Sequence, residues 1–134
     1  MTVLIAYGGS LLCFLMLDGI WLGLVARKFY KNQLGDKMLP SPRIPIAALF
    51  YLLFTAAVVI LAVMPAVTAH SPAIALTYGA VLGLAAFGTY DMTNLSTLKD
   101  WPLKMSIVDL AWGTFVTAAS SYAGYFAASL AAAG

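Results

Sequence analysis

The sequence predicts an all-α integral membrane protein, a four-helix bundle with both termini on the non-cytoplasmic side. Three observations predict this fold class. Hydrophobic residues make up 63% of the 134 residues and charged residues 9%, whereas soluble domains carry about 25% charged residues. The apolar residues form blocks of roughly the 20 residues that a helix needs to cross a bilayer. The Lys and Arg residues gather in two of the connections. The chain, residues 1–134, is expected to form a single membrane domain.

The first block predicts a span over about residues 2–26. No Lys or Arg precedes Arg27, so the block lacks the positive start of a secretory signal peptide and is expected to stay in the mature protein. The stretch RKFYKNQLGDK then predicts a helix that leaves the membrane with Phe29 and Tyr30 at the level of the headgroups. This helix is expected to end near Gly35, because glycine favours helix ends.

The other blocks predict spans over about residues 44–64, 73–91 and 102–131. The last of these spans has a recognisable start in LKDWPLKM. Asp100 is placed as the N-cap of this helix, because its side chain could accept a hydrogen bond from the first turn. Trp101 and Pro102 then occupy that turn, where the missing N–H of proline costs nothing.

The basic residues determine the expected orientation. Five lie between the first and second spans and two between the third and fourth, so these two connections lie on one side of the membrane. Because cytoplasmic loops are enriched in Lys and Arg, this side is expected to be the cytoplasm. Both termini and the turn at His70 then lie on the opposite side. The seven residues are Arg27, Lys28, Lys31, Lys37, Arg43, Lys99 and Lys104.

Three carboxylates inside or at the mouth of the spans are the candidates for function. An ionisable residue within a span costs several kcal/mol, so it tends to face the interior of the bundle and to mark a functional site. Asp18 and Asp109 are the clear cases. Asp91 lies at the cytoplasmic mouth of the third span and is followed by the polar residues Thr93 and Asn94.

Spans one and four each carry the pattern Asp-x-x-Trp, as DGIW and DLAW. Counted from the basic residue at the cytoplasmic end of each span, Asp18 lies about 13 Å deep and Trp21 about 9 Å. In the same way Asp109 lies about 8 Å deep and Trp112 about 12 Å. Because the two spans run antiparallel, each indole N–H is expected to reach the carboxylate opposite if the helices are neighbours.

Two interpretations of these residues stay open. In one, the Asp and Trp pairs fix the register of the bundle and have no further role. In the other, the three acids converge on a polar cavity that opens to the cytoplasm. The candidate ligand-binding or proton-coupling residues are then Asp18, Trp21, Tyr90, Asp91, Thr93, Asn94, Asp109 and Trp112.

Small residues form stripes on the third and fourth spans. They predict close helix packing or a homodimer, because small side chains let two backbones approach. The residues are Gly79, Gly83, Gly113, Ser120 and Gly124.

Several kinds of chemistry are not expected. Cys13 is the only cysteine and His70 the only histidine, so neither a thiolate cluster nor a site built on several histidines can form. No glycine-rich phosphate loop is present. We therefore predict no metal, no cofactor and no nucleic-acid partner. Membrane lipids are the expected partners.

The run YDMTNLSTLKDWPLKMSIVDLAWGT, preceded by a first helix with LDGIWLG, resembles the bacterial family of four-span membrane proteins filed as domain of unknown function 2177. The likeness covers essentially the full chain. It implies a multi-pass protein of the bacterial inner membrane and names no reaction. The motifs that carry the resemblance include these residues: Asp91, Thr93, Asn94, Asp109, Trp112 and Gly113.

Transport or binding of a cationic or amphipathic small molecule is the leading functional prediction, because buried carboxylates beside aromatic rings suit a cation that exchanges with protons. An alternative is an enzyme or accessory protein that acts on lipid at the cytoplasmic interface, with Asp91 and Asp109 as general acid and base or as Mg²⁺ ligands. No nucleophile can be assigned, so an enzyme is not favoured. A third alternative is a purely structural partner subunit.

Overall fold

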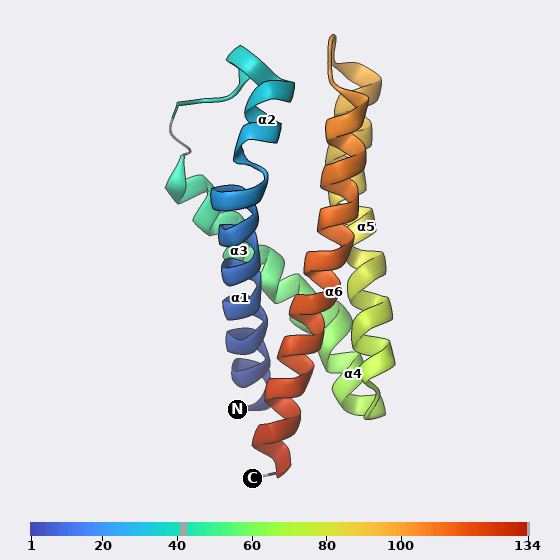
Figure 1. Ribbon diagram of the computed structural model, residues 1–134. Coiled ribbons are helices and arrows are strands. Elements are labelled where there is room, and N and C mark those ends of the chain that lie inside the picture. The colour runs from blue at the N-terminus through green and yellow to red at the C-terminus, as the bar shows by residue number, and fades with distance from the viewer. Residues whose placement is uncertain (41–42, 134) are drawn as a thin grey trace.

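The protein is all-helical, as the sequence predicts. The computed structural model describes residues 1–40 and 43–133, and these contain helices and no strand. Figure 1 shows long helices running side by side, with both termini at one end of the molecule and the α5–α6 turn at the other.

The first span does not continue as one regular helix into the basic segment. Helix α1 (Thr2–Ile20) passes into the π-helical turn η1 (Trp21–Val25), and α2 (Arg27–Leu34) follows after a break at Ala26. Helix α2 ends at Gly35, whose φ of 55° lies in the region that glycine tolerates best, and this confirms the predicted end. A short 3₁₀ turn, η2 (Gly35–Lys37), follows.

The next two helices form a hairpin. Helix α3 (Ile44–Val58), the π-helical turn η3 (Val59–Val63) and α4 (Met64–Ala69) make one continuous helix that ends at His70, where φ is 52°. Helix α5 (Pro72–Thr97) begins at once, and the Ser71 hydroxyl accepts a hydrogen bond from the Ile74 N–H at 3.2 Å.

Helix α6 (Leu103–Ala133) begins close to the predicted residue 102. Asp100 does not act as its N-cap, because it occupies the tight α5–α6 turn with φ of 60°. The first helical hydrogen bond runs from the Ser106 N–H to the Pro102 carbonyl at 3.3 Å. The Lys37 ammonium group stabilises this turn by donating hydrogen bonds to the carbonyls of Lys99 at 3.4 Å and Asp100 at 3.2 Å.

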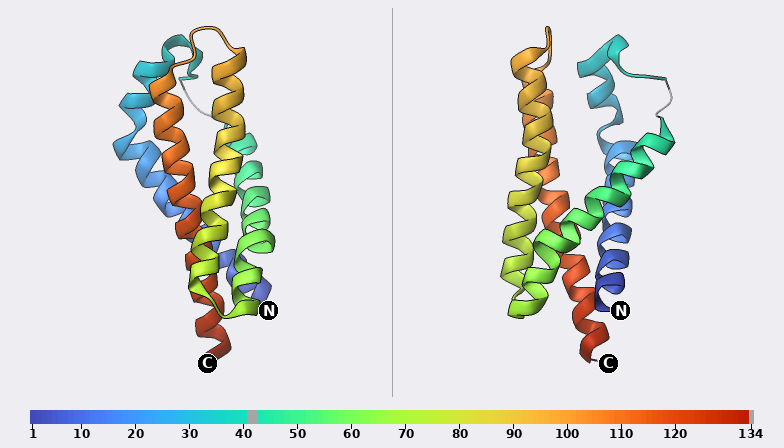
Figure 2. Two further views of the ribbon diagram at one scale, coloured as in Figure 1. Left: turned by 90° about the vertical axis from the view of Figure 1, so that its right-hand side faces the viewer. Right: turned by 180° about the vertical axis from the view of Figure 1, so that it is seen from behind.

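Helix α6 lies between α1 and α5 and packs along both. The helix Ile44–Ala69 crosses the others obliquely, as Figure 2 shows from behind. It packs against α5 chiefly through η3 and α4, whereas the start of α3 leans away from α5. The half of the bundle nearest α2 is therefore more open on the α3 side.

Close approach of α6 to its two neighbours depends on glycine. A Cβ atom added at Gly83 would meet the Gly113 carbonyl oxygen, and one at Gly113 would meet the Phe87 ring. A Cβ at Gly124 would meet the Ser10 side chain. The predicted stripes thus pack within the chain, and a homodimer, which stays a prediction, would need another face. The five buried residues of these stripes are Gly79, Gly83, Gly113, Ser120 and Gly124.

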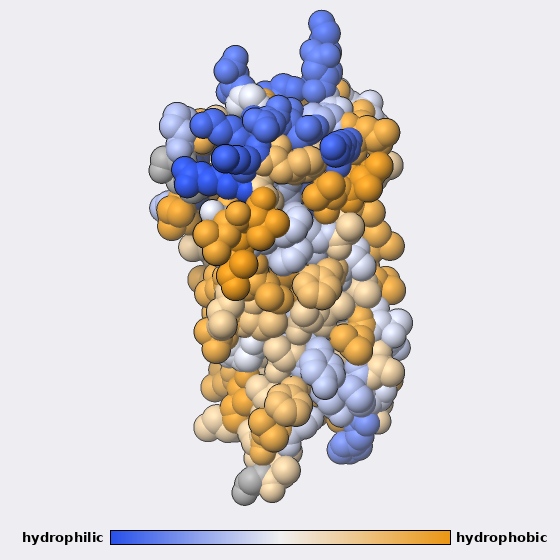
Figure 3. All heavy atoms as spheres, in the orientation of Figure 1, coloured by the Kyte–Doolittle hydropathy of each residue, from blue (hydrophilic) through white to orange (hydrophobic). Residues whose placement is uncertain are grey.

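The surface matches a membrane environment. Within residues 1–40 and 43–133, three helices are long and apolar enough to cross a membrane: Thr2–Val25, Ile44–Ala69 and Pro72–Thr97. Helix α6 is not among these three, and its buried face carries Ser106, Thr117, Ser120 and Ser121. The face shown in Figure 3 is mostly apolar along the body of the molecule, and hydrophilic residues gather at the end that carries α2 and the α5–α6 turn.

Candidate functional site

Asp18 lies on α1 and is 8% exposed. Its carboxylate accepts a hydrogen bond from the Trp112 indole N–H at 3.0 Å and another from the Tyr51 hydroxyl. The first of these confirms the predicted pairing of Asp18 with Trp112. Tyr51, from α3, is a partner that the sequence interpretation missed. Each donor reaches one of the two carboxyl oxygens, so the hydrogen-bonding requirement of Asp18 is met inside the bundle.

The predicted direct pairing of Trp21 with Asp109 is wrong, because Tyr30 lies between them. The Trp21 N–H donates to the Tyr30 hydroxyl at 3.0 Å, and that hydroxyl donates to Asp109 Oδ1 at 2.9 Å. The break at Ala26 separates α2 from α1, and α2 packs against α6, where Tyr30 is buried beside Met105 at 7% exposure.

The two Asp-x-x-Trp patterns nevertheless meet. The rings of Trp21 and Trp112 stack with centroids 4.4 Å apart and an interplanar angle of 6°. A continuous network therefore joins Asp18 to Asp109 through two stacked indoles and one phenol. Burial raises the pKa of the Tyr30 phenol, and Asp109 raises it further, so the phenol stays protonated as the donor.

Asp91 is the exceptional residue of the cluster. It is 0% exposed, and neither carboxylate oxygen accepts a hydrogen bond from an N–H or O–H group in the described part of the chain. Its neighbour is Asp109, whose carboxyl group is close enough for the two side chains to interact electrostatically.

The backbone around Asp91 is held by α6. The Ser106 hydroxyl donates to the Asp91 carbonyl at 3.2 Å and accepts from the Trp101 indole at 2.8 Å. The Trp101 ring packs edge-on against Tyr90, with centroids 5.9 Å apart. The end of α5 is thus fixed against the start of α6, and this positions Asp91 and Asp109 together.

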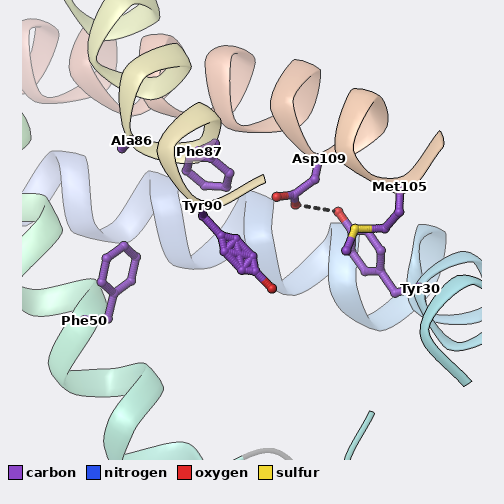
Figure 4. Close-up of a pocket in the computed structure, with 7 residues that line it drawn as sticks. All are labelled: Tyr30, Phe50, Ala86, Phe87, Tyr90, Met105 and Asp109. Carbon is purple, nitrogen blue, oxygen red and sulfur yellow. Dashed lines mark hydrogen bonds between the residues drawn. The ribbon is translucent and has the colours of Figure 1, made fainter. Parts of the chain in front are cut away.

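A cavity of about 380 Å³ lies beside Asp109. Figure 4 shows its polar end, formed by the Asp109 carboxylate, the Tyr30 phenol and Tyr90, with Phe50 of α3 at the other end. Tyr90 is 49% exposed and Phe50 51%, so the cavity reaches the outer surface between α3 and α5. Its lining is Tyr30, Phe50, Ala86, Phe87, Tyr90, Met105 and Asp109.

The predicted site residues fall into three groups. Tyr90 and Asp109 line the cavity, and Asp91 lies behind Asp109. Asp18, Trp21 and Trp112 belong to the network. Thr93 is exposed and Asn94 half-buried near the end of α5, and among the described residues neither belongs to the cavity lining.

Tyr51 could have been found from the sequence. It lies about 12 Å from Arg43 along α3, close to the depth of Asp18, and a phenol at matching depth is a natural donor to a buried acid. No comparable pattern in the sequence indicates the position of Tyr30, because that position depends on the break at Ala26.

The arrangement can bind a cation or hold a proton. Within the described residues, no three His, Cys, Asp or Glu side chains are grouped as a metal site. Carboxylate oxygens, phenol hydroxyls and aromatic faces are the groups presented to the cavity. They suit an organic ammonium group, which carboxylates and aromatic faces bind together.

An all-helical chain with an apolar exterior and buried acids defines this molecule as a helical membrane protein with a polar internal site. The chain belongs to the family of predicted membrane proteins DUF2177, which residues 3–126 match. This confirms the resemblance seen in the sequence, and the family has no established activity. No curated protein matches the chain, and no solved structure does.

Proposed function

We propose that the chain crosses the bacterial inner membrane four times, with α6 as the fourth span and both termini outside the cytoplasm. The support is that α6 has 31 residues, more than the roughly 20 that a span needs, and lies between two apolar helices. Its polar side chains face inward, which explains its lower hydropathy. Single cysteines in a Cys13→Ala background test this: a membrane-impermeant maleimide should label Ser71→Cys in intact cells and Lys99→Cys only in opened cells, and the reverse pattern contradicts it.

We propose that the cavity binds an amphipathic organic cation and exchanges it for a proton, as a small transporter does. One observation carries this proposal: the buried carboxylate of Asp91 has Asp109 as its neighbour and no donor from the described residues. A carboxylate that is fully buried beside a second carboxylate cannot be ionised at low cost, so the pair of Asp91 and Asp109 holds a proton. A cation that reaches Asp109 lowers the cost of ionisation, and the proton leaves.

The cavity suits the hydrophobic part of such a ligand. Its volume of about 380 Å³ falls within the range of small-molecule pockets, roughly 300–1,000 Å³. Phe87 and Met105 supply apolar contacts, and Tyr30 and Tyr90 present aromatic rings near the acid. Phe50 of α3 and Tyr90 of α5 both line the cavity and are about half exposed, so a ligand dissolved in the lipid has access to it between these two helices.

The test uses tetraphenylphosphonium, a lipophilic cation, with the protein in nanodiscs and empty nanodiscs as the blank. Wild type should bind the probe and release a proton into weakly buffered solution. Asp109→Asn should weaken binding about tenfold, the value of one charge-assisted contact, and abolish proton release. Asp36→Asn is the matched control, because Asp36 is exposed. Equal binding by wild type and Asp109→Asn, or binding without proton release, contradicts the proposal.

Asp18 is assigned a structural role in this account. Its carboxylate already has two donors, Tyr51 and Trp112, and it is not part of the cavity lining in the described residues. The interpretation in which a buried acid fixes the register of the bundle therefore applies to Asp18. The interpretation in which the acids form a binding site applies to Asp91 and Asp109.

A further inference from the structure

A second cavity, of about 960 Å³, lies on the other side of Tyr30, between η1, α2 and the segment 35–40. Its lining differs in kind from that of the acid cavity. Arg27 and Lys31 of α2 supply positive charge, and Leu22, Met38 and Leu39 supply apolar surface, with Asp36 beside them. We infer that this cavity binds an anionic phospholipid, with Arg27 and Lys31 on its phosphate.

The two cations are placed together without a partner. Arg27 and Lys31 are four residues apart and therefore project from the same side of α2, where like charges destabilise a helix. In the described part of the chain, neither side chain makes a hydrogen bond or an ion pair with the protein. A phosphate between them accepts hydrogen bonds from both and removes the repulsion.

Other basic residues at this end of the molecule are engaged elsewhere. Lys37 donates to two carbonyls of the α5–α6 turn, and Lys104 lies over the Phe29 ring with its nitrogen 6.0 Å from the centroid. Lys28 is exposed on α2 and is not part of the cavity lining. Arg27 and Lys31 are thus the cations that line the cavity.

The apolar walls favour a lipid over free phosphate. Leu22 is 41% exposed, Met38 39% and Leu39 50%, and all three line the cavity together with the two cations. This pairing matches a phosphate joined to glycerol and acyl chains. Asp36 adds an acceptor for a headgroup hydroxyl, so a glycerol headgroup suits the cavity better than a bare phosphate.

The inference does not rest on the proposed cation site, because the two cavities have separate charged groups. They share Tyr30 alone among the lining residues of the described chain. Loss of lipid binding and loss of cation binding are therefore distinguishable outcomes.

Native mass spectrometry of the full chain with added phosphatidylglycerol or phosphatidylcholine tests the site. Wild type should retain phosphatidylglycerol in preference to phosphatidylcholine. The double variant Arg27→Gln/Lys31→Gln should lose this preference about tenfold or more, as expected for two charge-assisted hydrogen bonds. The matched control Lys28→Gln/Lys104→Gln removes the same charge from residues that do not line the cavity and should keep the preference. Circular dichroism checks that both variants remain helical.

Two outcomes would overturn the inference. Diffuse attraction to an anionic surface acts on every basic residue near that surface, so equal losses in both double variants would show that no defined site exists. Displacement of the bound lipid by millimolar inorganic phosphate would show that the cavity takes soluble phosphate instead.

Discussion

At the scale of single residues, one sequence pattern serves two purposes. Asp18 and Asp109 both belong to Asp-x-x-Trp, but they differ in what surrounds them. Asp18 receives two hydrogen bonds and is enclosed, whereas Asp109 receives one from Tyr30 and faces both a cavity and Asp91. The number of hydrogen-bond donors that reach a carboxylate therefore determines whether it is available to bind a ligand.

The substitution Asp18→Asn tests the structural role. The side-chain NH₂ of asparagine cannot accept a hydrogen bond, so one of the two donors, Tyr51 or Trp112, is left unsatisfied in the bundle. The free energy of unfolding should fall by about 1–3 kcal/mol, while binding of tetraphenylphosphonium should be unchanged. Thermal unfolding in detergent and equilibrium dialysis measure the two effects. A stable variant that no longer binds the cation would move Asp18 into the binding site.

Tyr30→Phe should destabilise the protein by about 1–3 kcal/mol, because Trp21 loses its acceptor and Asp109 its donor. Tyr78→Phe, at an exposed position of α5, is the control. Since the folded state raises the pKa of Tyr30, the protonated phenol stabilises the fold at every pH below its ordinary value of about 10, and the contribution falls only above it. The difference between wild type and Tyr30→Phe should therefore be constant from pH 6 to pH 9, and a steep change there would refute the assignment.

At the scale of elements, helix packing through glycine holds the site together. Gly83 and Gly113 let α5 and α6 approach closely, and this approach places Asp91 beside Asp109. The apolar blocks predicted the long helices well, and Gly35 predicted the end of α2. The break at Ala26 and the turn at Asp100 could not be predicted, because both depend on packing between segments far apart in the chain.

Gly83→Ala should separate α5 from α6, since its Cβ would meet the backbone oxygen of Gly113 and the Thr117 side chain. Overpacking of this kind costs about 1–3 kcal/mol, so the melting temperature should fall. Gly8→Ala is the matched control on α1, where a Cβ has nothing within 4 Å. Equal melting temperatures for the two variants would mean that α5 and α6 do not pack as described.

At the scale of the whole molecule, the protein has polar groups inside and apolar groups outside. Charged residues gather at the end that holds α2 and the α5–α6 turn, and the candidate cavities lie in the same half. The sequence predicted the three acids and their half of the bundle. It could not predict that Tyr51 satisfies Asp18 or that Phe50 and Met105 line a cavity, since apolar residues on four helices look alike until the helices are packed.

The central claim is that Asp91 and Asp109 hold a proton that a cation displaces. Infrared difference spectroscopy of the protein with and without tetraphenylphosphonium measures this directly through the carbonyl stretch of a protonated carboxyl group. Wild type and Asp18→Asn should both lose that band when the cation binds, and Asp109→Asn should show no such change. A band that persists in wild type with the cation bound, or that disappears equally in Asp109→Asn, would contradict the account.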